Sequence, residues 1–286
     1  MGVRRADFAG SWYPGTESEC RAMIESFSDV SVPCPSFKRG VSGGIVPHAG
    51  WYYSGQIAFN VIKCLKHGIS PDIFVIFGRH LHPGSSNYIM KEGYWSTPMG
   101  ELEIDSYMAE RLISEFSFTV ETSSRYEQDN TIELQLPFIK YLFPDVKILP
   151  VGAPPKSSSI RIGERVQEIA EETGKKIFII GSTDLTHYGY NYGYIPKGTG
   201  KKAVEWVRNE NDKRMIDRIL AMDTEGIISE SLKSSNACCS GAVAAAVAAL
   251  KKMGAVKGEK LIYRTSYDVM PNDSFVGYAG IVFGKE

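Results

Sequence analysis

Short runs of apolar, mostly β-branched residues recur along the chain and are bounded by turn-forming residues. Continuous apolar runs of about 4–8 residues are typical of strands that are buried on both faces of a sheet. On this basis we predict strands at Val41–Val46, Ile73–Phe77, Val146–Val151, Lys176–Ile180, Leu261–Tyr267 and Val276–Phe283.

Amphipathic stretches fill most of the intervals between these runs. Apolar residues return there every three or four positions, which is the period of one helix face. We predict helices at Ser54–Lys66, Asp105–Glu115, Thr131–Tyr141, Ser157–Glu172, Gly200–Met222 and Ala237–Met253. Alternating strands and helices indicate βαβ units. The predicted fold class is therefore α/β: a single three-layer domain over residues 1–286, with a mostly parallel mixed sheet and helices on both faces.

Shorter segments are expected to add to this core. Tyr88–Met90 and Leu102–Ile104 are strand-like and could form an antiparallel addition to the sheet. Ser31–Ser36 is rich in Pro and Ser, which predicts a loop within the domain rather than a linker. The long segment Tyr188–Thr199 leaves room for a small lobe.

Composition and charge narrow the function classes. The chain has 286 residues, of which 43% are apolar and 23% charged, and its formal net charge is −1. Nucleic-acid binders carry a basic footprint, so we expect no nucleic-acid partner. No apolar run approaches the roughly 20 residues of a membrane helix, and the first residues lack the apolar core of a signal peptide. We therefore expect a cytoplasmic protein with no membrane association.

The cysteines support the same compartment. The chain has five, which is an odd number, and none of them forms a CxxC pair: Cys20, Cys34, Cys64, Cys238 and Cys239. Disulfide scaffolds occur mainly in small secreted domains, whereas cytosolic thiols stay reduced. We therefore expect a reducing cytoplasm rather than a disulfide-stabilised scaffold.

Three of the five histidines come shortly after predicted strands, at His48, His80 and His187. In an open α/β sheet, ligands bind outside the carboxyl ends of parallel strands. Histidine is also the commonest metal ligand and the side chain that titrates nearest neutral pH. Three imidazoles at three strand ends predict one shared site. We interpret the chain as a metal enzyme, or as a protein built on the fold of one.

The second of these strand ends carries two histidines. His80 and His82 would point to opposite faces of an extended segment, so only one is expected to face the cleft. Arg79 beside them could bind an anionic substrate, pair with a carboxylate or remain a surface charge.

The segment Ser182–Gly189 contains an acid and a base. Asp184 stands three residues before His187, a spacing that puts both on one side of a first helical turn. A carboxylate oriented toward an imidazole raises its basicity, which is a general-base arrangement. Two alternatives remain: both residues could be metal ligands, or Asp184 could cap a helix.

Two adjacent cysteines, Cys238 and Cys239, precede a helix rich in small residues. A cysteine at a helix N-terminus has a lowered pKa, and a thiolate is a soft ligand for iron, copper or zinc. From the spacing alone, however, we favour two buried small hydrophobic side chains.

Taken together, several motifs resemble the Memo-like proteins, which are related to the class III extradiol ring-cleaving dioxygenases. The resemblance covers nearly the whole chain. It rests on Ala9–Tyr13, Pro47–Gly50, the strand into His80, Ser96–Pro98, Ile132–Pro137, Ser182–Gly189 and Ser274–Gly280.

The resemblance implies a cleft in which His48, His80 and Cys238 bind a metal, with Asp184 and His187 beside it. In the dioxygenase relatives the third ligand is a glutamate, and the histidine that matches His187 acts as acid and base. Fe(II) is the expected ion. Copper and zinc are alternatives, because a thiolate is softer than a carboxylate.

The chain departs from the family pattern in three places. Phe77–His80 replaces the usual Gly-Pro-Asn/Ser-His, and an ungapped count puts His80, not His82, at the ligand position. Asp129–Thr131 replaces the common Glu-His-Ser, which removes one imidazole from the cleft. Cys239 stands where a glycine usually follows the ligand cysteine, which leaves open which sulfur faces the metal.

These features support two function hypotheses. In the first, the chain is a non-haem metal-binding protein with a His/His/Cys site, acting as an iron-dependent dioxygenase or another redox enzyme on a small aromatic molecule. In the second, the cleft binds a partner's peptide or modified side chain without turnover, and a radical-SAM protein is the partner that the resemblance implies. In both cases we expect aromatic residues near the cleft: Trp12, Trp51, Tyr52, Tyr53 and Tyr188.

Overall fold

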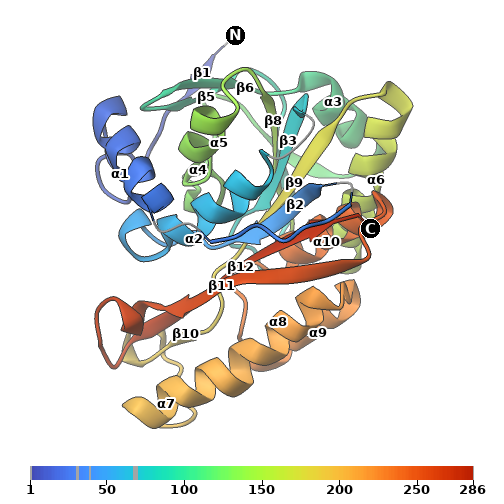
Figure 1. Cartoon of the computed structure of the whole chain (residues 1–286). Helices are drawn as coiled ribbons and strands as arrows, with labels where there is room; N and C mark the ends of the chain where they lie inside the picture. Colours follow the sequence, from blue (N-terminus) through green and yellow to red (C-terminus); the bar gives the residue numbers. More distant parts are fainter. Residues whose placement is uncertain (1, 30–31, 39, 67–69, 286) are drawn as a thin grey trace.

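The computed structural model describes residues 2–29, 32–38, 40–66 and 70–285, and a nine-stranded sheet runs through this part of the chain (Figure 1). The strands are β2 (Val41–Val46), β3 (Ile73–Gly78), β4 (Asn87–Met90), β7 (Phe118–Glu121), β8 (Lys147–Gly152), β9 (Ile177–Ser182), β10 (His187–Tyr188), β11 (Lys257–Thr265) and β12 (Phe275–Gly284). Their order is β10-β12-β2-β9-β3-β8-β4-β7, and β11 pairs with β12 beside this path.

The middle of the sheet is parallel. β2 pairs with β9, β9 with β3, and β3 with β8, all in parallel register. On the flanks, β12 is antiparallel to β2, and β4 is antiparallel to β8. The predicted mixed sheet is therefore confirmed, with parallel pairing at its centre. Because the four central strands run the same way, their carboxyl ends meet at one edge, where ligands bind in such sheets.

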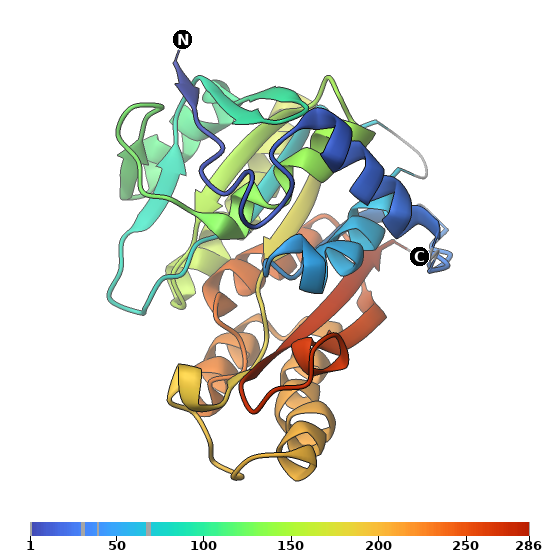
Figure 2. The same cartoon turned by 90° about the vertical axis from the view of Figure 1, so that its left-hand side faces the viewer.

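The helices are α1 (Glu17–Asp29), α2 (Trp51–Cys64), α3 (Ser106–Glu115), α4 (Asn130–Glu133), α5 (Leu136–Leu142), α6 (Ser157–Thr173), α7 (Lys201–Trp206), α8 (Asp212–Leu220), α9 (Thr224–Ser234) and α10 (Ser240–Lys252). Residues of α1, α2 and α5 share one apolar cluster with the sheet, and residues of α3, α6 and α10 share another. Helices thus cover both faces of one sheet (Figures 1 and 2), and the predicted α/β class is confirmed.

The side chains of β3 show why a continuous apolar run was needed. Ile73, Val75 and Phe77 belong to the cluster under α3, α6 and α10, whereas Phe74 and Ile76 belong to the cluster under α2 and α5. All five are fully buried. Alternate residues of a strand face opposite sides, so a strand covered on both sides needs apolar residues throughout.

Close packing between α6 and α10 fixes the helix that follows the paired cysteines. A Cβ atom on Gly163 would lie 2.0 Å from the carbonyl oxygen of Ala245, so only glycine allows this approach. The alanines of α10 are buried throughout, which lets the helix lie directly against the sheet.

Some predicted helices differ from those observed. The single helix expected at Thr131–Tyr141 is divided into α4 and α5, and Pro137, which lacks a backbone N–H, stands in the first turn of α5. A π-helix at Val207–Asn211 interrupts the helix expected at Gly200–Met222. α1 and α9 were not predicted. Within the described ranges, no helix has both the length and the apolar character needed to cross a bilayer.

The two short strand-like segments belong to different sheets. Tyr88–Met90 lies in β4 and extends the sheet by antiparallel pairing with β8, as predicted. Leu102, in contrast, belongs to a separate three-stranded sheet of β1 (Val3–Arg4), β5 (Tyr94–Thr97) and β6 (Gly100–Glu103), so the expected addition is wrong for this piece.

The segment expected as a small lobe has an apolar cluster of its own. Tyr188, Phe275 and residues of α7 form it, with Tyr194 packed against them. The segment contains a 3-10 helix at Tyr190–Tyr192, and a second one, Ser266–Asp268, leads from β11 toward β12.

One disulfide corrects the expectation from the cysteine pattern. Cys34 and Cys64 are bonded, whereas Cys20, Cys238 and Cys239 are free. The two partners are separated by 30 residues and meet because the loop that contains Cys34 passes the end of α2. Counting cysteines could not reveal this contact. The loop expected at Ser31–Ser36 has no regular structure over 32–36, and Ser31 lies outside the described residues.

Candidate metal centre

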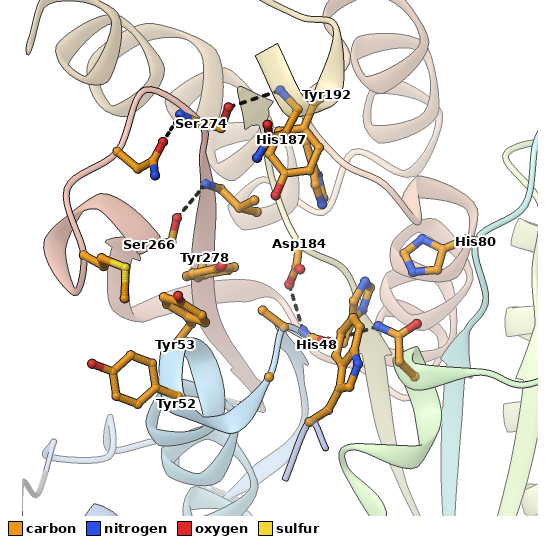
Figure 3. A pocket seen from close by; sticks show the side chains of 18 of the residues that line it. His48, Tyr52, Tyr53, His80, Asp184, His187, Tyr192, Ser266, Ser274 and Tyr278 are labelled. Atoms are coloured by element: carbon orange, nitrogen blue, oxygen red, sulfur yellow. Dashed lines mark hydrogen bonds between the residues drawn. The ribbon is translucent and has the colours of Figure 1, made fainter. Parts of the chain in front are cut away.

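A cleft of about 640 Å³ opens at the carboxyl ends of β2, β3 and β9 (Figure 3). The loops after these strands bring His48, His80 and Asp184 to its wall. The other lining residues are Ser11, Trp12, Ala49, Gly50, Tyr52, Tyr53, Asn130, His187, Asn191, Tyr192, Ser266, Met270, Asn272, Ser274, Val276 and Tyr278. Segments far apart in the sequence thus form one site.

His48 is held in one orientation by residues around it. It is buried, its Nδ1 lies 2.8 Å from Ser182 Oγ, and its backbone N–H donates to Asp184 Oδ1 at 2.8 Å. Asn130 Nδ2 donates to the His48 carbonyl at 3.1 Å. These bonds leave Nε2 directed at Cys238 Sγ, 3.3 Å away. A hydrogen bond on the second ring nitrogen is the usual way to orient an imidazole toward a metal.

His80 faces the same point from the end of β3. Its ring stands perpendicular to that of His48, with 4.9 Å between the ring centres, and its Nδ1 lies 3.6 Å from Cys239 Sγ. Both histidines are exposed, but His82 is directed elsewhere, and its Nδ1 accepts a hydrogen bond from the backbone N–H of Gly84. Of the two histidines after this strand, the structure brings only His80 to the cluster.

Arg79 is neither a surface charge nor part of the cleft lining. It is buried with a positive φ of 80°, and its guanidinium pairs with Glu121 at 2.7 Å and with Glu127 at 2.6 Å. Of the three interpretations of Arg79, carboxylate pairing is the one observed. This pairing anchors the residue immediately before His80.

Cys238 and Cys239 are fixed by the loop after β9. The backbone N–H of Cys238 donates to the Asp184 carbonyl at 3.1 Å, and that of Cys239 donates to Thr183 Oγ1 at 3.1 Å. The backbone N–H of Asp184 in turn donates to Cys238 Sγ at 3.3 Å. α10 begins at Ser240, so both cysteines lie just before its first turn, and the predicted range Ala237–Met253 starts three residues too early.

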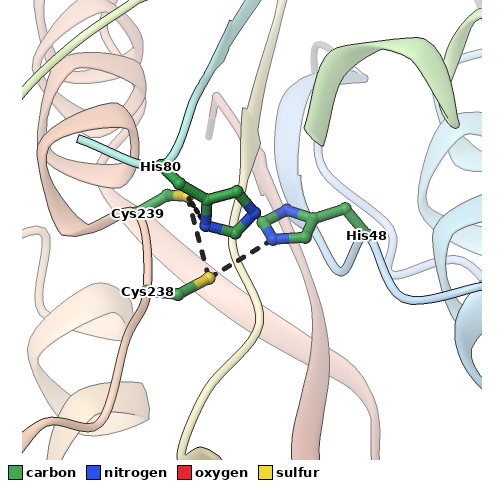
Figure 4. Close-up of side chains that lie close together, drawn as sticks. All are labelled: His48, His80, Cys238 and Cys239. Atoms are coloured by element: carbon green, nitrogen blue, oxygen red, sulfur yellow. Dashed lines mark hydrogen bonds between the residues drawn. The ribbon is translucent and has the colours of Figure 1, made fainter. Parts of the chain in front are cut away.

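Four side chains therefore converge with their donor atoms all within 4.8 Å of one another (Figure 4): His48, His80, Cys238 and Cys239. Zn–N and Zn–S bonds of about 2.0–2.3 Å place the ligand atoms of a tetrahedral shell about 3.3–3.8 Å apart. The Cys238–His48, Cys239–His80 and Cys238–Cys239 separations are 3.3, 3.6 and 3.7 Å. The donors thus fit a metal ion in type, three of their separations match a tetrahedral shell, and all of them lie within 4.8 Å.

The negative charges at the cluster favour a cation there. Burial by itself would lower the pKa of His48, but the charges of Asp184 and Cys238 outweigh burial and raise it to about 9. Burial opposes ionisation of Cys238 too, yet its hydrogen bond with Cys239 and the charge of His48 lower its pKa well below that of a free thiol. Burial and the neighbouring Cys238 sulfur raise the pKa of Cys239. Of the two thiols, Cys238 therefore has the lower pKa.

Asp184 and His187 both line the cleft, but not for the predicted reason. Residues 183–186 are not helical, so the two do not share a helix face, and Asp184 caps no helix. Asp184 accepts from the His48 backbone, and burial raises its pKa. His187 lies in β10, with Nδ1 3.2 Å from the Leu185 carbonyl and its ring against Tyr192.

The mouth of the cleft is aromatic and uncharged. Three of the expected aromatic residues line it: Trp12, Tyr52 and Tyr53. The other two do not, because Trp51 stacks on Phe138 and Tyr188 stacks on Phe275 in the core. Tyr192 takes their place. Tyr52 is 64% exposed, and among the described residues no lysine or arginine lines the cleft.

A buried polar group around Asp212 and Asn211 binds Thr186, the residue before His187, and no role was predicted for it from the sequence. Asp212 accepts hydrogen bonds from the backbone N–H and the hydroxyl of Thr186, and from the Tyr263 hydroxyl at 2.7 Å. Asn211 donates to Thr186 Oγ1 at 2.9 Å and accepts at its carbonyl from Asn236 at 2.8 Å. This group connects the His187 strand with the loop that leads to the cysteines. The π-helix that ends at Asn211 is an irregularity that is frequent at functional sites.

The family model and two of the most similar curated relatives name the same family. The family model described as "Memo-like protein" matches residues 4–282. A MEMO1 family protein of Pyrococcus furiosus is 35% identical over 99% of both chains, and one of Thermococcus onnurineus is 36% identical over 99% of this chain and 100% of its own. An uncharacterized protein of Escherichia coli K12 shares the fold at 11% identity, with a TM-score of 0.50 over 85% of this chain and all of its own. The chain belongs to the family of Memo-like proteins.

Proposed function

We propose that this chain is a non-haem metal-binding protein with a redox function, and that its ligands include His48, His80 and Cys238. The observation that carries the proposal is the convergence of four nitrogen and sulfur donors within 4.8 Å, of which the two imidazoles also line the cleft. Fe(II) is the ion that we propose first, with copper or zinc as alternatives, because imidazole suits all three and thiolate favours the softer ions.

An iron-dependent dioxygenase is the activity that fits this site best, in line with the resemblance to extradiol enzymes. When bound, Fe(II) would supply the redox chemistry between an aromatic substrate and dioxygen. His187 is the proposed acid and base. Its Nδ1 is held by the Leu185 carbonyl, which leaves Nε2 free to take a proton from a substrate and return it. Asp184 keeps His48 in position through its backbone N–H.

The substrate that we propose is a small, uncharged aromatic molecule. The cleft walls carry tyrosine, tryptophan, serine and asparagine side chains, and Asp184 is the carboxylate among the residues that line it. Aromatic walls favour stacked or edge-on contacts with a flat ring. A strongly anionic substrate would find no lysine or arginine among the described lining residues.

The test compares two histidines that lie two residues apart. His80→Ala should lose most of the Fe(II) that the parent retains after anaerobic loading and desalting, whereas the matched control His82→Ala should retain it. His187→Ala should keep the metal and lose turnover of catechols under oxygen. A parent protein that retains no metal, or equal losses in the two alanine variants, would overturn the proposed site.

A second candidate function rests on the exposure of the aromatic mouth. Trp12, Tyr52 and Tyr192 are 42%, 64% and 46% exposed. Such a surface is typical of a site that binds an aromatic or modified side chain of a partner peptide. In this case the cleft acts without turnover, alongside a radical-SAM protein.

A binding assay can distinguish this candidate from the enzyme. Tyr52→Ala should weaken the binding of an aromatic peptide several-fold, measured by fluorescence titration. Tyr107→Ala is the matched control, because Tyr107 is 47% exposed on α3 and does not line the cleft. Catechol turnover by the parent, together with equal peptide binding in all three proteins, would exclude the binding function.

A further inference from the structure

We propose that Cys239 is a fourth ligand, specific to this chain, and that the centre holds a tetrahedral, thiophilic ion in a His2Cys2 set rather than in a three-ligand set. The inference rests on the proposed metal binding and not on the proposed dioxygenase activity, because four protein ligands leave a tetrahedral ion no open position for substrate and dioxygen. It gives a role to the cysteine that replaces the usual glycine next to Cys238.

The positions of the two sulfurs carry this inference. Cys238 Sγ lies 3.3 Å from His48 Nε2, and Cys239 Sγ lies 3.6 Å from His80 Nδ1. Each sulfur thus has an imidazole nitrogen beside it, and the two sulfurs are 3.7 Å apart. These three separations fall within or close to the edges of about 3.3–3.8 Å that a tetrahedral shell around zinc requires.

The backbone holds both sulfurs in this arrangement. Thr183 Oγ1 accepts from the Cys239 N–H, and the Asp184 carbonyl accepts from the Cys238 N–H. These bonds fix the backbone positions from which both sulfurs project toward the imidazoles.

Cys20 shows what a purely structural cysteine looks like in the same chain. It is completely buried in the cluster under α1 and α2, and its Sγ donates to the Pro14 carbonyl at 3.2 Å. Cys239 is almost as buried, at 2% exposure, and also belongs to an apolar cluster, the one under α3, α6 and α10, but its sulfur in addition faces an imidazole and a second sulfur. Burial as a small hydrophobic residue accounts for Cys20 and does not account for the direction of Cys239.

A second thiolate changes which ion is retained. For a given site of nitrogen and sulfur donors, divalent zinc and copper bind more tightly than iron, and each added thiolate favours the softer ions further. Four protein ligands also complete a tetrahedral shell, which is the arrangement of structural rather than open catalytic zinc sites. We therefore expect Zn(II), or Cu(I) under reducing conditions, to displace Fe(II) from the parent protein.

Cobalt substitution counts the thiolates directly. Anaerobic titration with Co(II) should give the parent a sulfur-to-cobalt charge-transfer band and the intense visible bands of a tetrahedral ion. Cys239→Ser should show about half the charge-transfer intensity and bind Zn(II) at least about tenfold more weakly, which is the scale of losses at metal sites. Cys20→Ser, the matched control, should behave as the parent.

The outcomes separate this inference from the function on which it rests. If Cys239→Ser keeps the full charge-transfer band and the parent affinity for Zn(II), the fourth ligand is wrong and the three-ligand centre stands. If the parent binds neither Co(II) nor Zn(II), both proposals fail.

A measurement on the unchanged protein covers the case in which Cys239→Ser does not fold. In the parent, Zn(II) should slow alkylation of both Cys238 and Cys239, as located by fragment mass spectrometry, and leave the Cys20 rate unchanged. Protection of Cys238 alone would also overturn the fourth ligand.

Discussion

Two groups of charged residues in this protein use the same chemistry in opposite surroundings. Behind the metal cluster, Glu121 is buried and receives Arg4 at 3.0 Å and Arg79 at 2.7 Å. On the outer surface of α6, Arg161 is half exposed and pairs with Glu168 at 2.9 Å and with Glu164 at 3.1 Å. Distances alone would rank the two groups as equal.

The two groups differ in solvent exposure, and this changes the free energy that each ion pair contributes. An exposed ion pair exchanges hydration for attraction at little net gain, about 0–1 kcal/mol. A buried pair has lost its hydration, so removal of one partner leaves an uncompensated charge in the interior at about 3–5 kcal/mol. The buried group also helps to position His80, because Arg79 directly precedes His80 and has a left-handed backbone conformation.

The largest effect is expected at Glu121. Glu121→Ala leaves the guanidinium groups of Arg4 and Arg79 without the carboxylate between them, so the free energy of unfolding should fall by about 3–5 kcal/mol. Urea denaturation measures the loss. Metal retention should fall as well, because His80 follows Arg79. A loss below about 1 kcal/mol would mean that this buried group behaves like the surface pairs.

Glu133 extends the comparison to a buried carboxylate that is held by neutral donors. It accepts from the backbone N–H groups of Asp7 and Phe8 and from the Tyr13 hydroxyl. Burial outweighs these bonds and raises its pKa to about 7 from 4.5. The folded state therefore holds this proton more tightly than the unfolded state. The resulting stability is full below about pH 4.5 and is lost as pH rises through 7.

The predicted cost of ionising Glu133 is about 2–3 kcal/mol between pH 4.5 and pH 7.5, at about 1.4 kcal/mol per pKa unit. Glu133→Gln should remove this component of the pH dependence, since the amide does not titrate. Urea midpoints of both proteins at the two pH values give the comparison. Parallel curves for parent and variant would show that Glu133 ionises normally.

The strands of the sheet could be predicted because each one is encoded by a run of consecutive apolar residues. Val41–Val46 is apolar throughout, and the observed β2 has the same bounds. α1 was not predicted, although Cys20, Met23, Ile24 and Phe27 recur at helical spacing. The Cys34–Cys64 bond gave no local signal, because its partners meet only after α2 packs on the sheet.

In the candidate site too, some residues follow from local sequence patterns and others only from the tertiary structure. The position of His48 and His80 beside the cleft could be predicted because each follows a strand, where α/β folds collect their ligands, whereas Cys238 was proposed only through the family resemblance. The residues that orient them could not be predicted. Ser182 bonds His48 across 134 residues, and Glu121 bonds Arg79 across 42. Such partners depend on the tertiary structure, which no local pattern encodes.

A smaller effect is expected at Asp212, which is buried without a cation. Asp212→Asn replaces an acceptor of three hydrogen bonds by an amide that faces the same donors, Thr186 and Tyr263, so stability should fall by about 1–3 kcal/mol. His187 follows Thr186, so its ring signals should shift in NMR spectra. Tyr263→Phe is the control, because it removes a donor to Asp212 and leaves Thr186 bound. Unchanged His187 signals in Asp212→Asn would show that this group does not position the cleft.

The smallest effect is expected on the surface of α6. Arg161→Ala removes two ion pairs at once, but Glu168 keeps Lys252 at 3.2 Å and every partner remains in contact with water. The free energy of unfolding should therefore change by less than about 1 kcal/mol, and the difference should shrink further in 1 M salt, where the screening length is about 3 Å. Urea denaturation at low and high salt measures both. A salt-independent loss as large as that of Glu121→Ala would show that the α6 pairs are organised as firmly as the buried group, and that burial does not separate the two.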